Sequence, residues 1–573
     1  METRKGPILE HEACMKKDNK IAYFSMEICV DSNIPTYSGG LGVLAGDTIR
    51  SSADLGVPMI GMTLLYKKGY LKQTINQQGL QQEFPEVWNP QDYLTKLPGK
   101  VHVEIEKRRV YIQSWMYMIR GIDGEGVPVF FLDTDLPENA GYDRSLSDYL
   151  YGGDGRYRLA QEIVLGIGGV RMLKELGFVG ISRYHMNEGH ASLLALELLN
   201  NHINPQTGQW DMEQVKNRCV FTTHTPVPAG MDQFSYDLVK QVLGEQIPIP
   251  YDFLKNLAGE DCLNMTQLAL NLSHFINGVA KQHGMVSREM FPGYHIDSIT
   301  NGVHSVTWTG EYFSKLYDNY IPGWKSDPFS LRYALNIPDD EVWFAHQKTK
   351  EILIDYINQK YNSGFEKDIF TIGFARRATA YKRADLIFNN LDKLIDIARK
   401  NGKIQLVFAG KAHPRDESGK NLIQKIIQKS QQIKDHLNII YLENYNMDLG
   451  KMITSGVDVW LNTPRKPKEA SGTSGMKAAH NGIPSFSILD GWWVEGCIED
   501  ITGWSIGSAA NIESVDEDEA NSLYQKLEQK ILLAYYNDRN QWINIMRHCI
   551  AINASFFNTH RMVLQYISNA YLI

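Results

Sequence analysis

Short apolar runs alternate along this chain with longer segments of helical periodicity, and no other feature limits the possible folds as strongly. In the second half, runs typical of buried strands occupy residues 369–374, 404–409, 437–442, 457–461 and 484–489. Helical patterns, such as those at 384–400 and 421–434, lie between them. This alternation is typical of βαβ units with a parallel sheet. It predicts an α/β fold whose second half is a doubly wound domain.

The first half has a similar pattern with more inserted sequence. Expected strands cover residues 20–25, 58–65, 182–186 and 219–223. Residues 70–131 are predicted to form a β-rich, peripheral insertion. Residues 155–176 have apolar positions at helical spacing, and Gly177 provides a stop signal.

The length of the chain predicts more than one domain. The chain has 573 residues, whereas single hydrophobic cores stop growing beyond about 250–300 residues. We predict two doubly wound, Rossmann-like domains that face a cleft, an N-terminal one at 1–303 with the β-rich insertion and a C-terminal one at 304–548. A terminal helix at 549–573 is expected to pack back on the N-terminal domain. Open α/β sheets bind ligands at the carboxyl ends of their strands, so the site is expected in the cleft.

Composition and charge exclude some classes of protein. The net charge is −8 with both signs interspersed, so the chain lacks the broad basic surface that nucleic acid needs. No apolar run reaches the roughly 18 residues that span a membrane, and residues 1–20 do not resemble a signal peptide. We expect a cytoplasmic protein, with neither nucleic acid nor membrane as a partner. The composition is compatible with a homo-oligomer. A reducing compartment also suits the six widely spaced cysteines, which are Cys14, Cys29, Cys219, Cys262, Cys497 and Cys549.

A glycine-rich turn follows the first expected strand. It has the sequence Tyr37-Ser38-Gly39-Gly40-Leu41-Gly42 and precedes a helical pattern at 43–55. Glycines let the backbone approach an anion, and the N–H groups of the following helix can donate to it. A tight turn without a ligand explains the same residues equally well.

A basic cluster follows the expected strand at 369–374. It contains Arg376, Arg377, Lys382 and Arg383. Cations this close repel one another unless an anion or carboxylates compensate them. A solvated basic loop is the general alternative, but the position at a strand end favours phosphate.

A third cluster follows the expected strand that ends at 461. Its sequence is Glu469-Ala470-Ser471-Gly472-Thr473-Ser474-Gly475-Met476-Lys477. Small hydroxylated residues and glycines at a helix start can cradle a phosphate, and Lys477 would lie beside it. A lysine beside a phosphate cradle is what a pyridoxal-phosphate Schiff base requires.

Histidines lie at the ends of two further strands. His185, Glu188 and His190 lie at the end of one expected strand, and His224 lies at the end of another. Their spacing does not match the H-E-x-x-H zinc motif, so we expect no metal site. Hydrogen bonds to sugar hydroxyls, or a structural role, are the expected functions of these histidines.

Taken together, these residues resemble the α-glucan phosphorylase family, in particular its short bacterial and archaeal members. The run at 469–477 is similar to the family's E-A-S-G-T-x-x-M-K signature, and the resemblance extends from Tyr23-Phe24-Ser25-Met26-Glu27 to the terminal helix. It implies a glycosyltransferase B-type fold with pyridoxal phosphate in the cleft. The implied reaction is a retaining phosphorolysis of α-1,4-glucan, such as glycogen or maltodextrin, by inorganic phosphate to α-glucose 1-phosphate.

The resemblance also implies roles for individual residues. Lys477 would form the Schiff base, Thr473, Ser474 and Arg376 would hold the cofactor phosphate, and Tyr445 and Trp308 would flank the cofactor. The substrate phosphate would be bound by Arg377, Lys382 and the backbone N–H of Gly40. The positions that would hold the glucosyl unit are Glu469, Ser471, Gly472, His224, Asn301, Tyr381 and Gly39, with the backbone at His224 stabilising an oxocarbenium-like glucosyl unit.

The chain departs from the long phosphorylases at two places. Cys29 stands where they have a tyrosine near the cofactor, and Val306-Thr307 replaces an arginine pair before Trp308. The chain lacks the length for their N-terminal phosphorylation segment and nucleotide site, so we expect no allosteric regulation of that type. Two other functions stay open: a nucleotide-sugar-dependent glucan synthase of the same fold, which does not need the lysine signature, and a non-catalytic glucan-binding protein.

Overall fold

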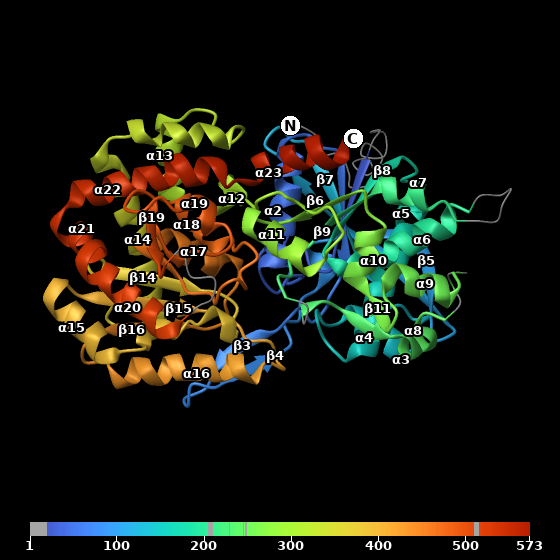
Figure 1. Ribbon diagram of the computed structural model, residues 1–573, viewed down its shortest axis with the longest axis horizontal. Coiled ribbons are helices and arrows are strands. Elements are labelled where there is room, and N and C mark those ends of the chain that lie inside the picture. Colours follow the sequence, from blue (N-terminus) through green and yellow to red (C-terminus); the bar gives the residue numbers. More distant parts are fainter. Residues whose placement is uncertain are drawn as a thin grey trace.

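The computed structural model describes residues 20–203, 210–227, 230–244, 246, 249–508 and 515–572. Cys14 and Ile573 therefore lie outside the described residues. The first and second halves of the chain form two α/β lobes side by side (Figure 1), each built on one large sheet. None of the helices in the described ranges combines the length and the apolar character that crossing a bilayer requires.

The first lobe contains a nine-stranded sheet with the order β13-β12-β9-β8-β1-β2-β7-β6-β5. The four strands expected in this half, at 20–25, 58–65, 182–186 and 219–223, are confirmed to within two residues at each end. The strands that pair in parallel are β1 (Lys20–Ser25), β2 (Met59–Leu64), β7 (Gly126–Asp133), β8 (Ile181–Asn187), β9 (Cys219–Thr222), β12 (Phe275–Gly278) and β13 (Asp297–Ser298).

The stretch 70–131 is β-rich as predicted, but it is not wholly peripheral. β5 (Thr95–Ile105), β6 (Arg108–Arg120) and β7 form an antiparallel edge of the main sheet, and β7 pairs with the central strand β2. Seven of the eight residues of β7 are buried, so this strand needs cover on both faces. Within residues 70–131, only the hairpin of β3 (Lys72–Ile75) and β4 (Gln81–Phe84) forms a separate sheet.

The second lobe contains a six-stranded, wholly parallel sheet with the order β16-β15-β14-β17-β18-β19. The five strands expected here are confirmed to within two residues at each end, while β19 was not predicted. The strands of this six-stranded sheet are β14 (Phe370–Ala375), β15 (Ile404–Ala409), β16 (Asn438–Leu442), β17 (Val459–Asn462), β18 (Ser485–Ile488) and β19 (Gly503–Ile506). The main helices around it are α14 (Asp339–Tyr361), α15 (Leu391–Asn401), α16 (Glu417–Gln432), α17 (Met447–Gly456), α20 (Asp516–Lys526) and α22 (Arg539–His548).

Packing on both faces explains why these strands are apolar throughout. In β15, Leu406 and Phe408 belong to one buried cluster, whereas Val407 and Ala409 belong to the cluster on the other face. The helix expected at 384–400 is shorter than predicted, because Leu386–Phe388 forms a 3₁₀ turn. α15 begins only after Asn390, whose side chain accepts a hydrogen bond from the N–H of Lys393 and so caps the helix.

The C-terminal segment joins the two lobes. Residues Cys549–Ala554 still pack in the core of the second lobe, so only the later part of the expected segment 549–573 lies against the first lobe. There α23 (Thr559–Tyr566) packs against α2 (Gly40–Asp54) (Figure 1). The hydroxyl of Tyr571 lies 2.7 Å from Nδ1 of the buried His185.

The hairpin β3–β4 makes a second connection between the lobes. Nε2 of Gln73 donates to the carbonyl of Gly410 at 2.9 Å, and Nε2 of Gln81 donates to the carbonyl of Ala412 at 3.0 Å.

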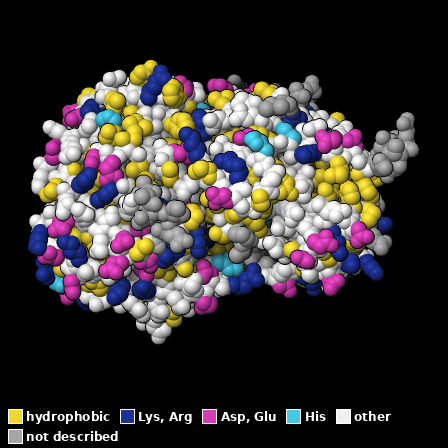
Figure 2. All heavy atoms as spheres, viewed as in Figure 1, with side chains coloured by type: hydrophobic (Ala, Val, Ile, Leu, Met, Phe, Trp, Pro, Cys, Tyr) yellow, Lys and Arg dark blue, Asp and Glu magenta, His cyan; other side chains and the backbone are white. Residues whose placement is uncertain are grey.

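The visible surface is mixed in charge. Figure 2 shows Lys and Arg interspersed with Asp and Glu over this face.

Candidate active site

The predicted site residues lie on elements that meet between the two lobes. Gly40 is the first residue of α2 in the first lobe. Arg376 and Arg377 directly follow β14, and the run at 469–477 connects β17 to α18 (Ser474–Ala479) in the second lobe. Nη2 of Arg377 donates to Oγ of Ser38 at 3.1 Å and thereby joins the basic loop to the glycine-rich turn.

Carboxylates compensate three of the four clustered cations. Nη1 of Arg376 lies 2.8 Å from Oε2 of Glu469, and Lys382 donates to the same oxygen. Arg383 forms ion pairs with Asp516 and Glu519 and therefore turns away from the site. Burial opposes ionisation of Glu469, but the Arg376 and Lys382 charges prevail and lower its pKa to about 2. Glu469 is thus a permanent anion that holds two cations in place.

Arg377 differs from the other three cations. Within the described part of the chain it forms no ion pair, and its side chain is exposed to solvent. A Cβ atom added to Gly39 would lie 3.1 Å from Nη2 of Arg377, so glycine permits this close approach. A Cβ atom added to Gly40 would meet nothing within 4 Å. Arg377 and the start of α2 therefore border open space that an anion can enter.

Glu27 holds the glycine-rich turn and was not singled out from the sequence. Its Oε2 accepts hydrogen bonds from the N–H groups of Ser38 and Gly39, the latter at 3.2 Å. Its Oε1 accepts a hydrogen bond from the hydroxyl of Tyr151 at 2.8 Å. Glu27 lies two residues after the end of β1, and this position near a strand end was the available signal.

Lys477 is buried, with 6% of its surface exposed. Its Nζ lies 3.7 Å from the centre of the Trp308 ring, and Nε1 of Trp308 donates to Oδ2 of Asp47 at 2.7 Å. Burial lowers the pKa of Lys477 to about 8. The thiol of Cys29 faces Sδ of Met447 at 3.3 Å. Burial raises the pKa of Cys29 to about 12, so it stays protonated.

The turn before Lys477 approaches Arg376. Gly472 has a φ of 76°, and a Cβ atom there would lie 3.1 Å from Nη2 of Arg376. Oγ of Ser471 is buried without a hydrogen-bond partner among the described residues. The carbonyl of Thr473 accepts a hydrogen bond from the N–H of Lys477 at 3.1 Å.

Three aromatic residues complete this group. Oγ of Ser474 accepts a hydrogen bond from Nε1 of Trp460 at 3.0 Å. Tyr445 is close enough to Arg376 for that charge to oppose the effect of burial, which raises the pKa of Tyr445 to about 12. Nζ of Lys382 lies 4.5 Å from the centre of the Tyr381 ring.

The predicted residues His224 and Asn301 contact residues other than the predicted site residues. His224 donates its backbone N–H to Oε2 of Glu188 at 2.7 Å, and its Nε2 lies 2.6 Å from Oδ1 of Asn187. Burial lowers the pKa of His224 to about 3, so the ring is neutral. Oδ1 of Asn301 is buried and has no partner among the described residues. The backbone carbonyl of Asn301 accepts a hydrogen bond from Nη2 of Arg561 at 2.9 Å.

The two other clustered histidines turn to different partners. His185 lies between Tyr571 and Thr222, with its Nε2 2.9 Å from Oγ1 of Thr222. Nε2 of His190 lies 3.3 Å from Oδ2 of Asp232. They do not share a ligand position.

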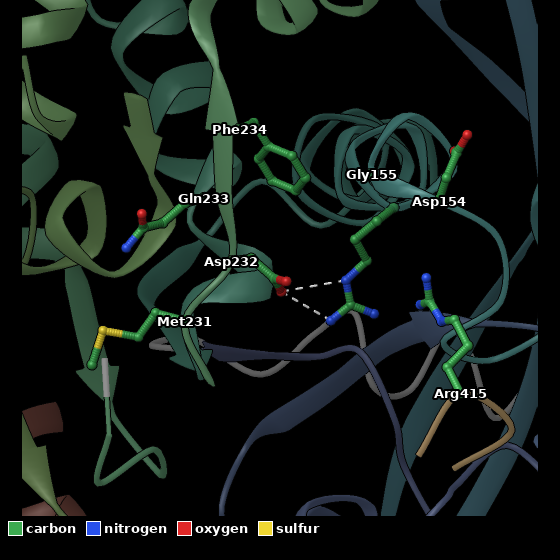
Figure 3. A pocket seen from close by; sticks show the side chains of 8 residues that line it. Asp154, Gly155, Met231, Asp232, Gln233, Phe234 and Arg415 are labelled. Carbon is green, nitrogen blue, oxygen red and sulfur yellow. Dashed lines mark hydrogen bonds and ion pairs between the residues drawn. The ribbon is translucent and has the colours of Figure 1, made fainter. Parts of the chain in front are cut away.

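A cavity of about 350 Å³ lies beside the predicted residues and contains none of them. Figure 3 shows side chains of the first lobe facing Arg415, which comes from the second lobe. Nη2 of Arg158 lies 3.0 Å from Oδ2 of Asp232, and the Arg158 guanidinium lies 4.6 Å from the centre of the Tyr151 ring. Because Tyr151 also contacts Glu27, the cavity adjoins the glycine-rich turn. The cavity is lined by Asp154, Gly155, Arg158, Met231, Asp232, Gln233, Phe234 and Arg415.

Several known proteins are similar in sequence to this chain over most of its length. Residues 253–504 match the carbohydrate phosphorylase family. Maltodextrin phosphorylase of Thermococcus litoralis is 39% identical over 97% of this chain and 71% of its own length. Glycogen phosphorylase of Mycobacterium tuberculosis is 34% identical (96% and 70%), and glycogen phosphorylase of Aquifex aeolicus is 33% identical (96% and 86%). The chain therefore belongs to the carbohydrate phosphorylase family, as an enzyme of the α-glucan phosphorylase type.

Proposed function

We propose that this enzyme uses pyridoxal phosphate and inorganic phosphate to convert α-1,4-glucan into α-glucose 1-phosphate with retention of configuration. One observation carries the proposal: a buried lysine of lowered pKa lies beside a carboxylate-compensated basic cluster with one cation, Arg377, left free of ion pairs in the described ranges. The relatives with known names act on maltodextrin and glycogen.

The residues around Lys477 fit pyridoxal phosphate. A pKa of about 8 leaves part of the Lys477 amine neutral near pH 7, and only the neutral amine attacks an aldehyde. Arg376, the Thr473–Ser474 turn and the unpartnered Oγ of Ser471 offer charge and hydrogen bonds for a phosphate group. Trp308 and Tyr445 supply flanking aromatic surface. Bound there, the cofactor would supply a second phosphate that can share a proton with the substrate phosphate.

We assign the substrate phosphate to the space beside Arg377, Lys382 and Gly40. Arg377 can donate two parallel hydrogen bonds to a phosphate, and the first N–H groups of α2 point toward the same space. Glu469 keeps Lys382 oriented through their ion pair. Two phosphates side by side repel, so these cations stabilise the proximity that the reaction requires.

The glucosyl unit is assigned to the space that Asn301 and His224 border in the first lobe and Glu469 and Ser471 border in the second. Oδ1 of Asn301 and Oγ of Ser471 are buried polar atoms that lack partners among the described residues, and sugar hydroxyls can satisfy both. Burial keeps the ring of His224 neutral, and its Nε2 lies 2.6 Å from Oδ1 of Asn187, so the ring can form hydrogen bonds without adding charge.

The remaining glucan chain is assigned to the 350 Å³ cavity. Its lining is mainly polar, with the side chains of Asp232, Gln233 and Arg415, and the lining residue Phe234 is 4% exposed. Convergent hydrogen-bonding groups are what sugar hydroxyls require. The cavity also opens next to the turn that would bind the phosphate.

We further propose that the two lobes are Rossmann-like domains of the glycosyltransferase B type, divided near residue 303. The parallel order of the second sheet supports this, because it matches the 3-2-1-4-5-6 order of the doubly wound fold. A cytoplasmic location is supported by Cys29, Cys219, Cys262, Cys497 and Cys549, which are all free thiols.

Borohydride reduction tests the assignment of the cofactor. The purified protein should absorb as a pyridoxal-phosphate enzyme, and reduction followed by peptide mapping should leave the pyridoxyl group on Lys477. Lys477→Ala should lose both the attached group and activity. A label on a different lysine refutes the assignment, whereas a colourless active protein that uses a nucleotide-glucose donor supports a synthase instead.

A further inference from the structure

Three side chains from distant parts of the chain converge outside the proposed active site. Asp54 is the last residue of α2, His304 precedes α12 (Ser305–Trp308), and His560 belongs to α23. Nε2 of His304 lies 2.8 Å from Oδ2 of Asp54, and Nε2 of His560 lies 3.0 Å from the same oxygen. The three ligand atoms all lie within 4.8 Å of one another.

We propose that Asp54, His304 and His560 bind one divalent transition-metal ion of the zinc class. Two imidazole nitrogens and one carboxylate oxygen form a common ligand set for Zn²⁺, with water at the fourth position. The three side chains are 5%, 8% and 7% exposed. Ligands that converge in a buried position lose little conformational entropy when the ion binds.

Neighbouring groups orient two of the ligands as metal sites require. Oδ1 of Asp54 accepts a hydrogen bond from the N–H of Ile122 at 3.0 Å, which leaves Oδ2 as a single ligand atom. Nδ1 of His304 lies 2.6 Å from Oγ1 of Thr307 and accepts a hydrogen bond from the N–H of Thr307 at 3.3 Å. Such outer hydrogen bonds fix the orientation of a ligating histidine.

Binding requires a small rearrangement. Bonds of about 2.0–2.2 Å in a tetrahedral site place ligand atoms about 3.4 Å apart, so the oxygen and nitrogens must separate by roughly half an ångström. Each neutral imidazole keeps one proton, which moves from Nε2 to Nδ1. In His304 this proton then points toward Oγ1 of Thr307, and the hydrogen bond that Nδ1 accepts from the N–H of Thr307 at 3.3 Å is lost. Nδ1 of His560 has no partner within the described ranges, so the change of tautomer breaks no hydrogen bond there.

The ion would join three segments that hold the lobes together. Asp54 ends the helix whose other end carries Gly40, His304 lies on the crossing between the lobes, and His560 lies on the returning C-terminal helix. No residue assigned to phosphate, cofactor or glucan is a ligand. Metal binding is therefore expected to affect stability rather than the chemical step.

Calorimetric titration of the full-length, chelator-treated and dialysed holoenzyme with Zn²⁺ tests the proposal. We expect one ion per chain, with at least tenfold weaker binding in both His304→Gln and His560→Gln. The matched control is His295→Gln, because His295 lies 3.6 Å from Asp297 on the surface with 91% of its side chain exposed. This control should bind Zn²⁺ like the unmodified protein.

Two further measurements keep the test independent of how the variants fold. Zn²⁺ should raise the melting temperature of the unmodified protein and of His295→Gln, but not of His560→Gln. The Co²⁺ derivative of the unmodified protein should show the intense visible bands of a four- or five-coordinate site. Absence of stoichiometric binding, an affinity of both ligand variants equal to that of the unmodified protein, or only the weak bands of octahedral Co²⁺ would overturn the proposal and leave a purely hydrogen-bonded cluster.

Discussion

Replacement of Arg377 by alanine isolates the binding of the substrate phosphate. In the described structure Arg377 makes one hydrogen bond to a neutral hydroxyl and no ion pair, and it is exposed. Its loss should therefore change the free energy of unfolding by about 1 kcal/mol or less. Hydrogen bonds between charged partners contribute about 1.5–3 kcal/mol each.

These values give the expected kinetic effect. A loss of about 3 kcal/mol corresponds to roughly a hundredfold fall in kcat/KM for phosphate, since each 1.4 kcal/mol is a factor of ten. The KM for maltodextrin should change little. The assay is the initial rate of α-glucose 1-phosphate formation, with phosphate and maltodextrin varied in turn and thermal melting as a control for folding.

Arg415→Ala is the matched control for this prediction. Arg415 is also an exposed cation of the second lobe, but it lines the 350 Å³ cavity assigned to glucan. It should raise the KM for maltodextrin and leave phosphate kinetics nearly unchanged. If Arg377→Ala alters the affinity for glucan alone, or weakens the affinities for phosphate and glucan equally, Arg377 does not bind the substrate phosphate and the reasoning is wrong.

Two further predictions concern Glu469 and Lys477. Glu469→Gln leaves Arg376 and Lys382 without their shared carboxylate, which should lower the free energy of unfolding by about 3–5 kcal/mol. Added phosphate should then raise the melting temperature more in this variant than in the unmodified protein. An equal rise in both proteins would contradict the assignment. Burial lowers the pKa of Lys477 to about 8, so the rate at which apoprotein is loaded with pyridoxal phosphate should rise with pH below 8 and level off above it. A loading rate that keeps rising to pH 10, measured by stopped-flow absorbance, would show that Lys477 has the pKa of an ordinary exposed lysine.

The strands could be predicted from the sequence because their residues are buried on both faces. In β14 and β15 every residue is buried, and such continuous apolar runs between turns are visible locally. β19 escaped prediction because it is a four-residue strand that contains Gly503 and Ser505. Residues 70–131 were recognised as β structure, but the pairing of β7 with β2 depends on tertiary contacts.

The basic cluster could be predicted in part. Its sequence required compensating charge, and the structure supplies it from Glu469, Asp516 and Glu519. Nothing local distinguished Arg377 as the cation without an ion pair, because that difference depends on where each long side chain finds a carboxylate. The residues at 469–477 were recognisable because one continuous run carries them.

Sites assembled from separate segments could not be predicted. The cavity joins Arg158, Asp232 and Arg415, which lie more than 70 residues apart from one another. The cluster of Asp54, His304 and His560 likewise spans most of the chain. No periodicity or spacing rule connects such residues, so they become visible only when the sheets and the returning C-terminal helix bring them together.

The dependence of glucan cleavage on phosphate tests the central claim most directly. Maltodextrin incubated with the holoenzyme and no phosphate should release almost no glucose, because water cannot supply the charge that Arg377, Lys382 and the start of α2 would bind. Addition of phosphate should yield α-glucose 1-phosphate, and arsenate should yield free glucose because its glucosyl ester hydrolyses. Rapid release of glucose without either anion would identify a hydrolase and contradict the account.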